Sequence, residues 1–482
     1  MDWPLYIQLS LMMFLQFAVW GAWSPVLAAR LLGPLTLVAC VLVLWQVWQR
    51  PDPAPFSVAL GGFAPPLGIN FYVDQLALLF AMATPLLSLM FWPWRGDREG
   101  KVREHALMLL LVASATGLAL SGDLFNMYVF YELLAVASFG LVAVKGSGRV
   151  YVATIRYLFI SGFGSVLTLV GVAIVYMEAG TVNLAQLAQL APETLNTPLG
   201  LAAFVCFLIG FGVKAELFPV NTWVPEVYAA APRRISALLA GLVSKLAVLV
   251  VVRLLVLVFP HPDAMQLMLV LGILGMVSGE LAAWRAKDYP RMLALSSIGQ
   301  LGIVFIAFSI PGDAGLLAGL AVALHHLIIK PPLFALAVRW GGSLDDLTGA
   351  AMRAPVVAAL FVLFALSIIG VPPLPGFWTK LLVLTGLAQE GQALQMLAFA
   401  AILVVTVIEA NYLFRLAARL YQKVEQPPRG PARLDIGAAA LMGAVVIVVT
   451  LMIDPVGDKL RDVAREASDV SAYISTVLPE DR

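Results

Sequence analysis

The chain has 482 residues, of which 61% are hydrophobic and 12% are charged, whereas a soluble protein carries about 25% charged residues. This composition excludes a mainly soluble protein and predicts a polytopic membrane protein with little mass outside the bilayer. The formal net charge of +1 indicates no particular partner, and we expect no nucleic-acid binding. The two cysteines, Cys40 and Cys206, lie singly within apolar runs, which excludes a cysteine-held metal site or cluster.

Apolar runs of about 17–25 residues are the sequence signal of membrane-spanning helices. Fourteen such runs predict an all-α membrane protein with about fourteen transmembrane helices. The first run has no cleavage pattern after it, so we expect a retained helix and not a removed signal peptide. The predicted spans are 6–26, 31–49, 73–94, 105–121, 124–144, 153–177, 199–230 (broken), 234–259, 265–285, 291–310, 314–340, 355–386 (broken), 394–421 and 434–453.

The segments between and after these spans have their own composition. Residues 51–72 are rich in proline and glycine and predict a loop. A short surface helix is expected in the polar connector 181–198 and another in the charged tail that begins at Asp454. Most of the 30 basic residues lie in loops that follow odd-numbered spans. By the positive-inside rule these loops are cytoplasmic, and both termini are expected on the other side of a bacterial or archaeal inner membrane.

The stretch 211–232 interrupts the seventh span with two ionisable residues and two prolines. Lys214 and Glu216 lie among apolar residues, and Pro219 and Pro225 break the helix. Broken helices are tolerated at membrane depth only where they face protein or a water-filled cavity. A snorkelling lysine is the alternative, but Lys214 lies about 15 residues inside its span, or about 22 Å at 1.5 Å per residue. The stretch therefore predicts an ion-handling site.

Three further lysines lie near the middle of other spans: Lys245, Lys330 and Lys380. Ionisable residues inside membrane segments usually mark ion pathways. Acidic residues at similar depth are Glu132, Glu216 and Glu409, and the histidines His325 and His326 lie one turn before Lys330. For Glu409, a transport role and a stabilising pair with a neighbouring helix remain equally open.

A second proline-rich break, VPPLPGFWTK (371–380), lies beside Lys380. The first broken span runs inward and the second outward, and matched breaks of opposite direction indicate an inverted repeat, spans 4–8 against spans 9–13. Packing kinks are the alternative explanation for either set of prolines alone. The expected domains are 1–104 (helices 1–3), 105–259 (first repeat), 265–425 (second repeat) and 426–482 (last helix and tail).

Six ordered stretches resemble a known family of proton-conducting, antiporter-like membrane subunits. This family is shared by respiratory NADH:quinone oxidoreductase, membrane-bound hydrogenases and multisubunit Mrp cation/proton antiporters. Within it, the stretch GDLFNMYVFYEL (122–133) and the loop 60–74 look most like the D-type subunits of Mrp antiporters. The carrying stretches are SGDLFNMYVFYELL (121–134), VKAELFPVNTWVPEVYAAAP (213–232), SALLAGLVSKLAVLVVVRL (236–254), DYPRMLALSSIGQLG (288–302), LHHLIIKPPLFALA (324–337) and PPLPGFWTKLL (372–382).

The resemblance implies a role for each candidate proton-pathway residue. Glu132 and its lysine partner Lys214 would form the first half-channel, and Lys245 would bridge the two halves. The central axis would carry His325, His326 and Lys330, and Lys380 would end the second half-channel. Glu216 and Glu409 are possible additional pathway residues.

The resemblance also implies a function. The expected function is a proton-translocating subunit of a multisubunit Na+/H+ antiporter. The alternatives are a proton-pumping subunit of NADH:quinone oxidoreductase or of a membrane-bound hydrogenase, and a coupling subunit for uptake of a solute such as inorganic carbon. We expect other membrane subunits as partners, H+ and Na+ as transported ions, and no catalytic residue, cofactor or bound metal in this chain. Any redox chemistry would then belong to other subunits.

Overall fold

The computed structural model describes residues 31–94, 102–144, 146–337, 342–427 and 433–478, so the first predicted span, 6–26, lies outside the described residues. The described elements are α3 (Gly33–Trp48), β1 (Phe56–Ala59), β2 (Asn70–Val73), α4 (Gln75–Met90), α5 (Val102–Leu120), α6 (Leu124–Ala143), α7 (Gly148–Ala179), α8 (Leu184–Thr194), α9 (Pro198–Gly212), α10 (Val224–Ala230), α11 (Arg233–Leu238), the π-helix η3 (Leu239–Val243), α12 (Ser244–Leu257), α13 (Pro262–Arg285), α14 (Tyr289–Phe308), α15 (Gly312–Leu336), the 3-10 helices η4 (Leu344–Leu347) and η5 (Ala350–Met352), α16 (Pro355–Ile369), α17 (Pro375–Glu390), α18 (Ala393–Leu420), α19 (Arg433–Leu451), α20 (Ile453–Ser468) and α21 (Val470–Val477).

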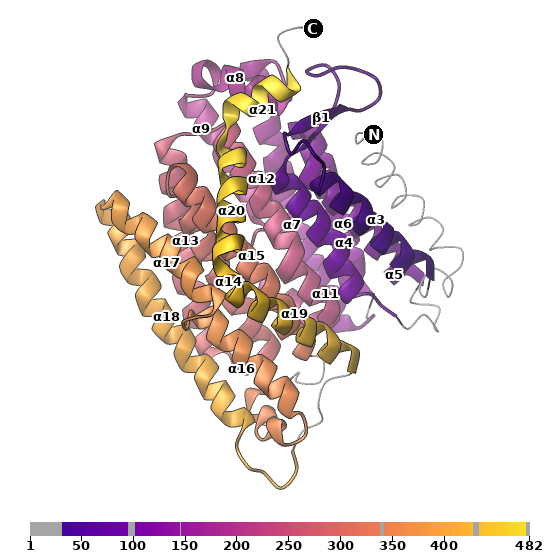
Figure 1. Cartoon of the computed structure of the whole chain (residues 1–482), viewed down its shortest axis with the longest axis vertical. Coiled ribbons are helices and arrows are strands. Elements are labelled where there is room, and N and C mark those ends of the chain that lie inside the picture. The colour runs from indigo at the N-terminus through magenta and orange to yellow at the C-terminus, as the bar shows by residue number, and fades with distance from the viewer. Residues whose placement is uncertain (1–30, 95–101, 145, 338–341, 428–432, 479–482) are drawn as a thin grey trace. The chain divides into compact units, whose positions relative to one another are not determined.

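The described part of the chain is mostly helical (Figure 1). By length and composition, eight of its helices could cross a membrane, or ten if each of two bent helix pairs is one span. The helices α3, α4 and α9 are apolar but have only 15 or 16 residues. The two spans predicted to be broken are interrupted, between α9 and α10 and between α16 and α17. In contrast, α15 continues through Pro331 and Pro332.

The chain divides into two compact units. Unit 1 contains Met1–Ala215, Leu242–Ala264 and Arg465–Arg482, and unit 2 contains Glu216–Gly241 and Met265–Ala464. In unit 1, α7 packs on α9, α5 packs on α4 and α6, and α12 packs on α5, α8 and α9. In unit 2, α15 packs on α11, α14, α16, α17 and α19, and α18 packs on α16 and α17.

An antiparallel β-hairpin covers most of the proline- and glycine-rich loop predicted at 51–72 and extends one residue beyond it, with Phe56 opposite Val73 and Ala59 opposite Asn70. Asn70 ties this hairpin to the helices of unit 1. Its carbonyl accepts from the backbone N–H of Gly122 at 3.0 Å, and its Oδ1 accepts from Nδ2 of Asn183, the N-cap of α8, at 3.0 Å. A Cβ on Gly122 would lie 2.6 Å from Asn70 Nδ2. The start of α6, which carries Glu132, is thereby fixed against the hairpin.

A buried ion pair joins α12 to the start of α4. Arg253 donates to Asp74 Oδ1 at 2.6 Å, and the two side chains are 7% and 1% exposed. The same Asp74 oxygen caps α4 by accepting from the N–H of Ala77 at 2.7 Å. Arg253 also lies over the rings of Tyr72 and Tyr473, whose centroids are 3.9 Å apart. The guanidinium therefore holds the hairpin, α4 and the C-terminal helix α21 together.

We expect Arg253→Leu to destabilise the chain by about 3–5 kcal/mol, because removal of one partner leaves the other charge of a buried pair uncompensated. The measurement is the midpoint of thermal unfolding in detergent, followed by loss of solubility. Arg461→Leu is the matched control: Arg461 pairs with Asp458 on the surface of α20, and exposed pairs contribute about 0–1 kcal/mol. Equal midpoints for the two variants would contradict a stabilising role of the buried pair.

Candidate functional site

All four lysines predicted at membrane depth are buried. Lys214, Lys245, Lys330 and Lys380 are 1%, 0%, 0% and 8% exposed. A snorkelling lysine would keep its ammonium in contact with solvent or head groups, so these values exclude that alternative for Lys214. A buried ammonium group is costly unless it is paired or gives up its proton. The contacts of each lysine therefore decide what it can do.

In unit 1, Lys214 lies against an aromatic ring and not against a carboxylate. Its Nζ is 3.7 Å from the ring centroid of Tyr131 and makes no hydrogen bond within the described residues. Tyr131 is held in place because its hydroxyl donates to the carbonyl of Gly210 at 2.9 Å. Glu132 is the acidic group that acts on Lys214 electrostatically, yet its buried Oε1 has no hydrogen-bond partner among the described residues. The predicted pair is thus within electrostatic reach but not joined by a direct bond.

Lys245 lies at the point where an irregular helix becomes regular. It is the second residue of α12, two residues after the end of the π-helix Leu239–Val243. Its Nζ donates to Ser244 Oγ at 3.0 Å. A π-helical turn inside a longer helix often occurs at a functional site, which agrees with the selection of Lys245 as a candidate.

In unit 2, Glu216 has an unusual backbone. Its φ of 58° is the only positive value at a non-glycine residue in the described ranges, and such a conformation costs about 1–3 kcal/mol. Two contacts hold it: Tyr228 donates to Glu216 Oε1 at 2.6 Å, and Asn221 Nδ2 donates to its carbonyl at 3.2 Å. Glu216 also acts electrostatically on Lys330. The interruption before α10 therefore places a carboxylate near the lysine of α15.

The polar groups of α15 contact hydroxyl and carbonyl oxygens. Lys330 Nζ donates to Ser296 Oγ at 2.7 Å and to the Leu293 carbonyl at 3.3 Å. His325 Nε2 lies 2.9 Å from Ser367 Oγ, and His326 Nε2 lies 3.4 Å from Ser297 Oγ. Since hydroxyls both donate and accept, they can pass a proton on.

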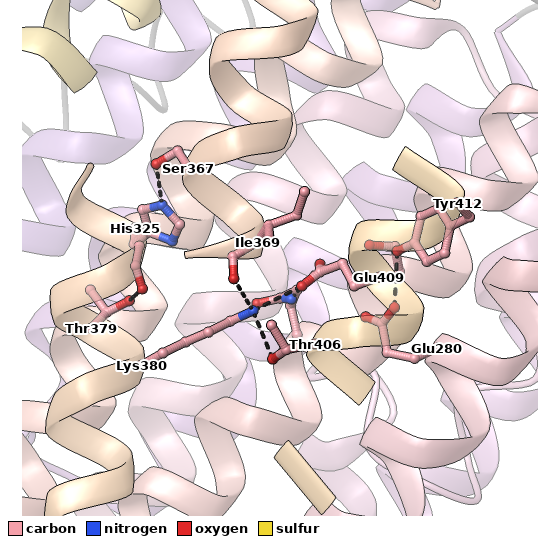
Figure 2. A network of polar contacts seen from close by, with 12 residues as sticks. Glu280, His325, Ser367, Ile369, Thr379, Lys380, Thr406, Glu409 and Tyr412 are labelled. Atoms are coloured by element: carbon pink, nitrogen blue, oxygen red, sulfur yellow. Dashed lines mark hydrogen bonds and ion pairs between the residues drawn. The ribbon is translucent and has the colours of Figure 1, made fainter. Parts of the chain in front are cut away.

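Lys380 forms an ion pair with Glu409, with 2.9 Å between Nζ and Oε2 (Figure 2). The break between α16 and α17 explains how Lys380 is held, because the last carbonyls of a helix lack an intrahelical partner. The Ile369 carbonyl at the end of α16 accepts from Lys380 at 3.1 Å. Glu409 Oε1 in turn accepts from Gln300 Nε2 at 2.7 Å. The structure thus joins two predicted candidates, Lys380 and Glu409, in one buried network.

The sequence interpretation missed two residues of this network, Glu280 on α13 and Tyr412 on α18. The Tyr412 hydroxyl donates to Glu280 Oε2 at 2.9 Å (Figure 2), and Glu280 is 1% exposed. A signal was present, since Glu280 interrupts an apolar run five residues before Arg285, and Tyr412 follows Glu409 by three residues on the same helix face.

Comparisons with known proteins agree with this fold. Residues 121–406 match the family model described as NADH:quinone oxidoreductase/Mrp antiporter, TM. The chain is 30% identical over 478 residues to the NADH-quinone oxidoreductase N subunit of Desulforudis audaxviator, and the match covers 93% of each chain. It is 31% identical to the Na(+)/H(+) antiporter D subunit of Bacillus subtilis, with 70% of each chain covered.

Solved structures of membrane complexes contain chains with the same fold. A chain of the membrane-bound sulfane sulfur reductase, an archaeal respiratory membrane complex, matches with a TM-score of 0.91 and 30% identity over 99% of each chain. A chain of the Mrp complex from Dietzia sp. has the same fold, with a TM-score of 0.89, 24% identity and 99% of each chain covered. The chain therefore belongs to the family of NADH:quinone oxidoreductase and Mrp antiporter transmembrane subunits.

Proposed function

We propose that this chain is a proton-translocating subunit of a multisubunit Na+/H+ antiporter, of the D type. The observation that carries the proposal is the arrangement of its buried lysines. Lys380 shares a hydrogen bond with a carboxylate, whereas Lys214 lies on a ring and Lys330 contacts neutral oxygens. Lysines that lack a direct carboxylate partner can gain or lose a proton when one neighbouring charge changes.

The residues that we propose for the proton pathway are Glu132, Lys214, Lys245, His325, His326, Lys330 and Lys380, with Glu216 and Glu409 as additional members. We further propose fourteen spans, with inverted repeats at 105–259 and 265–425 between an N-terminal segment, 1–104, and a last helix and tail, 426–482. Both termini would face the non-cytoplasmic side of the inner membrane. Other membrane subunits would pack beside the chain, as in the multisubunit complexes that contain its structural relatives.

We expect Glu132→Ala and Lys214→Ala each to abolish cation/proton exchange without removing the protein from the membrane. Each change leaves one buried charge without its electrostatic partner and traps it in one protonation state. The assay is sodium-dependent dissipation of a pH gradient in everted vesicles that contain the whole complex, normalised to the amount of this chain. Exchange near the wild-type rate in both variants would refute the pathway assignment.

A second candidate is a proton-pumping subunit of a redox complex. It is favoured by the relative from NADH-quinone oxidoreductase and by the match to an archaeal respiratory complex. The two functions differ in their partner subunits. Purification of the native complex through this chain, followed by mass spectrometry, decides between them: flavin or iron–sulfur subunits would indicate the redox function, and small membrane subunits alone would indicate the antiporter.

A further inference from the structure

Glu280 is a buried carboxylate of unit 2 that the proposed pathway does not use. It lies on α13, and α13 comes close to α14 through glycines: a Cβ on Gly302 would lie 2.4 Å from the backbone nitrogen of Met276, and one on Gly279 would lie 2.6 Å from that of Gly299. A Cβ on Gly299 would lie 2.3 Å from Glu280 Oε1. The absence of a side chain at Gly299 therefore creates the space that the carboxylate occupies.

Only one of the two carboxylate oxygens of Glu280 accepts a hydrogen bond within the described residues. Oε2 accepts from the Tyr412 hydroxyl at 2.9 Å, whereas Oε1 is buried and has no hydrogen-bond partner within the described residues. A buried carboxylate with one free oxygen is costly in its charged form. The same oxygen is a place where a proton can bind, because a carboxyl group can donate as well as accept once it is protonated.

A series of polar groups leads from Lys330 to Glu280. Lys330 donates to Ser296 Oγ at 2.7 Å, Ser296 is among the groups that act electrostatically on Tyr412, and Tyr412 donates to Glu280. On its other side, Glu280 acts electrostatically on Glu409, which is bonded to Lys380. Figure 2 shows Tyr412, Glu280, Glu409 and Lys380 together in this network. Glu280 thus lies between the two lysines of unit 2.

We propose that Glu280 is a proton-carrying residue that connects Lys330 to the Glu409–Lys380 pair. This inference rests on the proposed function and adds to it a residue and a route. One proton leaves the Lys330 ammonium for Ser296 Oγ, the Ser296 hydroxyl gives one to Tyr412, and Tyr412 gives one to Glu280. The net result is a neutral Lys330 amine and a Glu280 carboxylic acid, with both hydroxyls unchanged.

The second transfer explains the position of Glu409. When Glu280 passes its proton to Glu409, Glu409 becomes neutral and Lys380 loses its counter-charge. An ammonium group that is buried without a counter-charge is strongly destabilised, so Lys380 releases its proton onward. Two neighbouring buried carboxylates favour sharing one proton over ionising together. The pair is therefore suited to hold one proton between the lysines.

The decisive variant is Glu280→Gln. Glutamine has nearly the same shape, and its amide oxygen still accepts from Tyr412, but the amide cannot take up a proton. We expect the initial rate of proton translocation by the assembled complex in everted vesicles to fall at least tenfold, with Glu280→Asp retaining more activity than Glu280→Gln. Tyr412→Phe, which removes only the hydroxyl, should also reduce the rate at least threefold. Infrared difference spectra after a pH jump should lose a protonated-carboxyl band in Glu280→Gln.

Matched controls are Ser278→Ala on α13, whose exposed hydroxyl bonds only within its helix, and Tyr289→Phe, whose buried hydroxyl donates to the Leu333 carbonyl. Both should translocate protons at the wild-type rate. A normal rate in Glu280→Gln with an unchanged carboxyl band would overturn the inference, since Glu280 would then be only a hydrogen-bond acceptor. If Glu280→Gln does not assemble, a normal rate in Tyr412→Phe overturns it equally. An inactive Lys214→Ala beside a normal Glu280→Gln would leave the proposed function standing, whereas normal rates in both would remove it.

Discussion

Replacement of Lys380 by arginine should impair transport almost as strongly as replacement by alanine. Arginine can keep the ion pair with Glu409, but its guanidinium stays protonated under all relevant conditions and cannot release a proton. If Lys380 passes protons on, its positive charge alone is not sufficient. The measurement is the rate of cation-dependent proton movement in everted vesicles that contain the whole complex. The same result is expected for Lys245→Arg.

Lys287→Arg is the control for the change in side-chain shape, because Lys287 is exposed in the turn between α13 and α14. This variant should transport normally. Normal transport by Lys380→Arg would mean that Lys380 is a fixed charge and not a relay. A double variant, Lys380→Met with Glu409→Leu, separates transport from stability, because removal of both charges of a buried pair is often neutral or stabilising. We expect this double variant to assemble and to be inactive.

The positions of the helices could be predicted from the sequence because the bilayer allows few alternatives. A long apolar run with satisfied backbone groups must be a helix, and the predicted runs within the described residues contain helices. The hairpin 56–73 was missed because its strands have only four residues each. Four residues are too few for an alternation of apolar and polar side chains to be recognised.

The burial of the lysines could also be predicted, because a charged residue in the middle of a membrane span faces the protein interior or a water-filled cavity and not lipid. Their contacts could not. That Lys214 lies on the Tyr131 ring, or that Lys380 bonds the Ile369 carbonyl, depends on how distant helices pack. Glu280 was missed for a related reason. Glu280 lies near the end of its apolar run, where an acidic residue is expected at the membrane surface. It is buried because glycines of α13 and α14 let the two helices approach closely.

The isolated chain should show no sodium-dependent or voltage-driven proton flux when it is purified and reconstituted into liposomes. Co-expression with its partner subunits should restore the flux. The proposed pathway runs between buried groups, so it needs entry and exit routes that neighbouring subunits would complete. Buried lysines also repel one another unless acids or neighbours balance them. Among Lys214, Lys330 and Lys380, only Lys380 has a direct bond to a carboxylate of the described residues.

The outer faces of the helices agree with this expectation. In the apolar 18-residue stretch of α7 that could span a membrane only 33% is buried within the protein, and in that of α18 only 22%. In the corresponding stretch of Arg233–Leu257 the buried share is 100%. The faces of α7 and α18 are therefore open to lipid or to other subunits, and α18 carries Glu409 and Tyr412. An inactive chain that becomes active only with its partners would show that the pathway is completed between subunits. Robust exchange by the lone chain in liposomes would contradict this and make the chain a self-sufficient carrier.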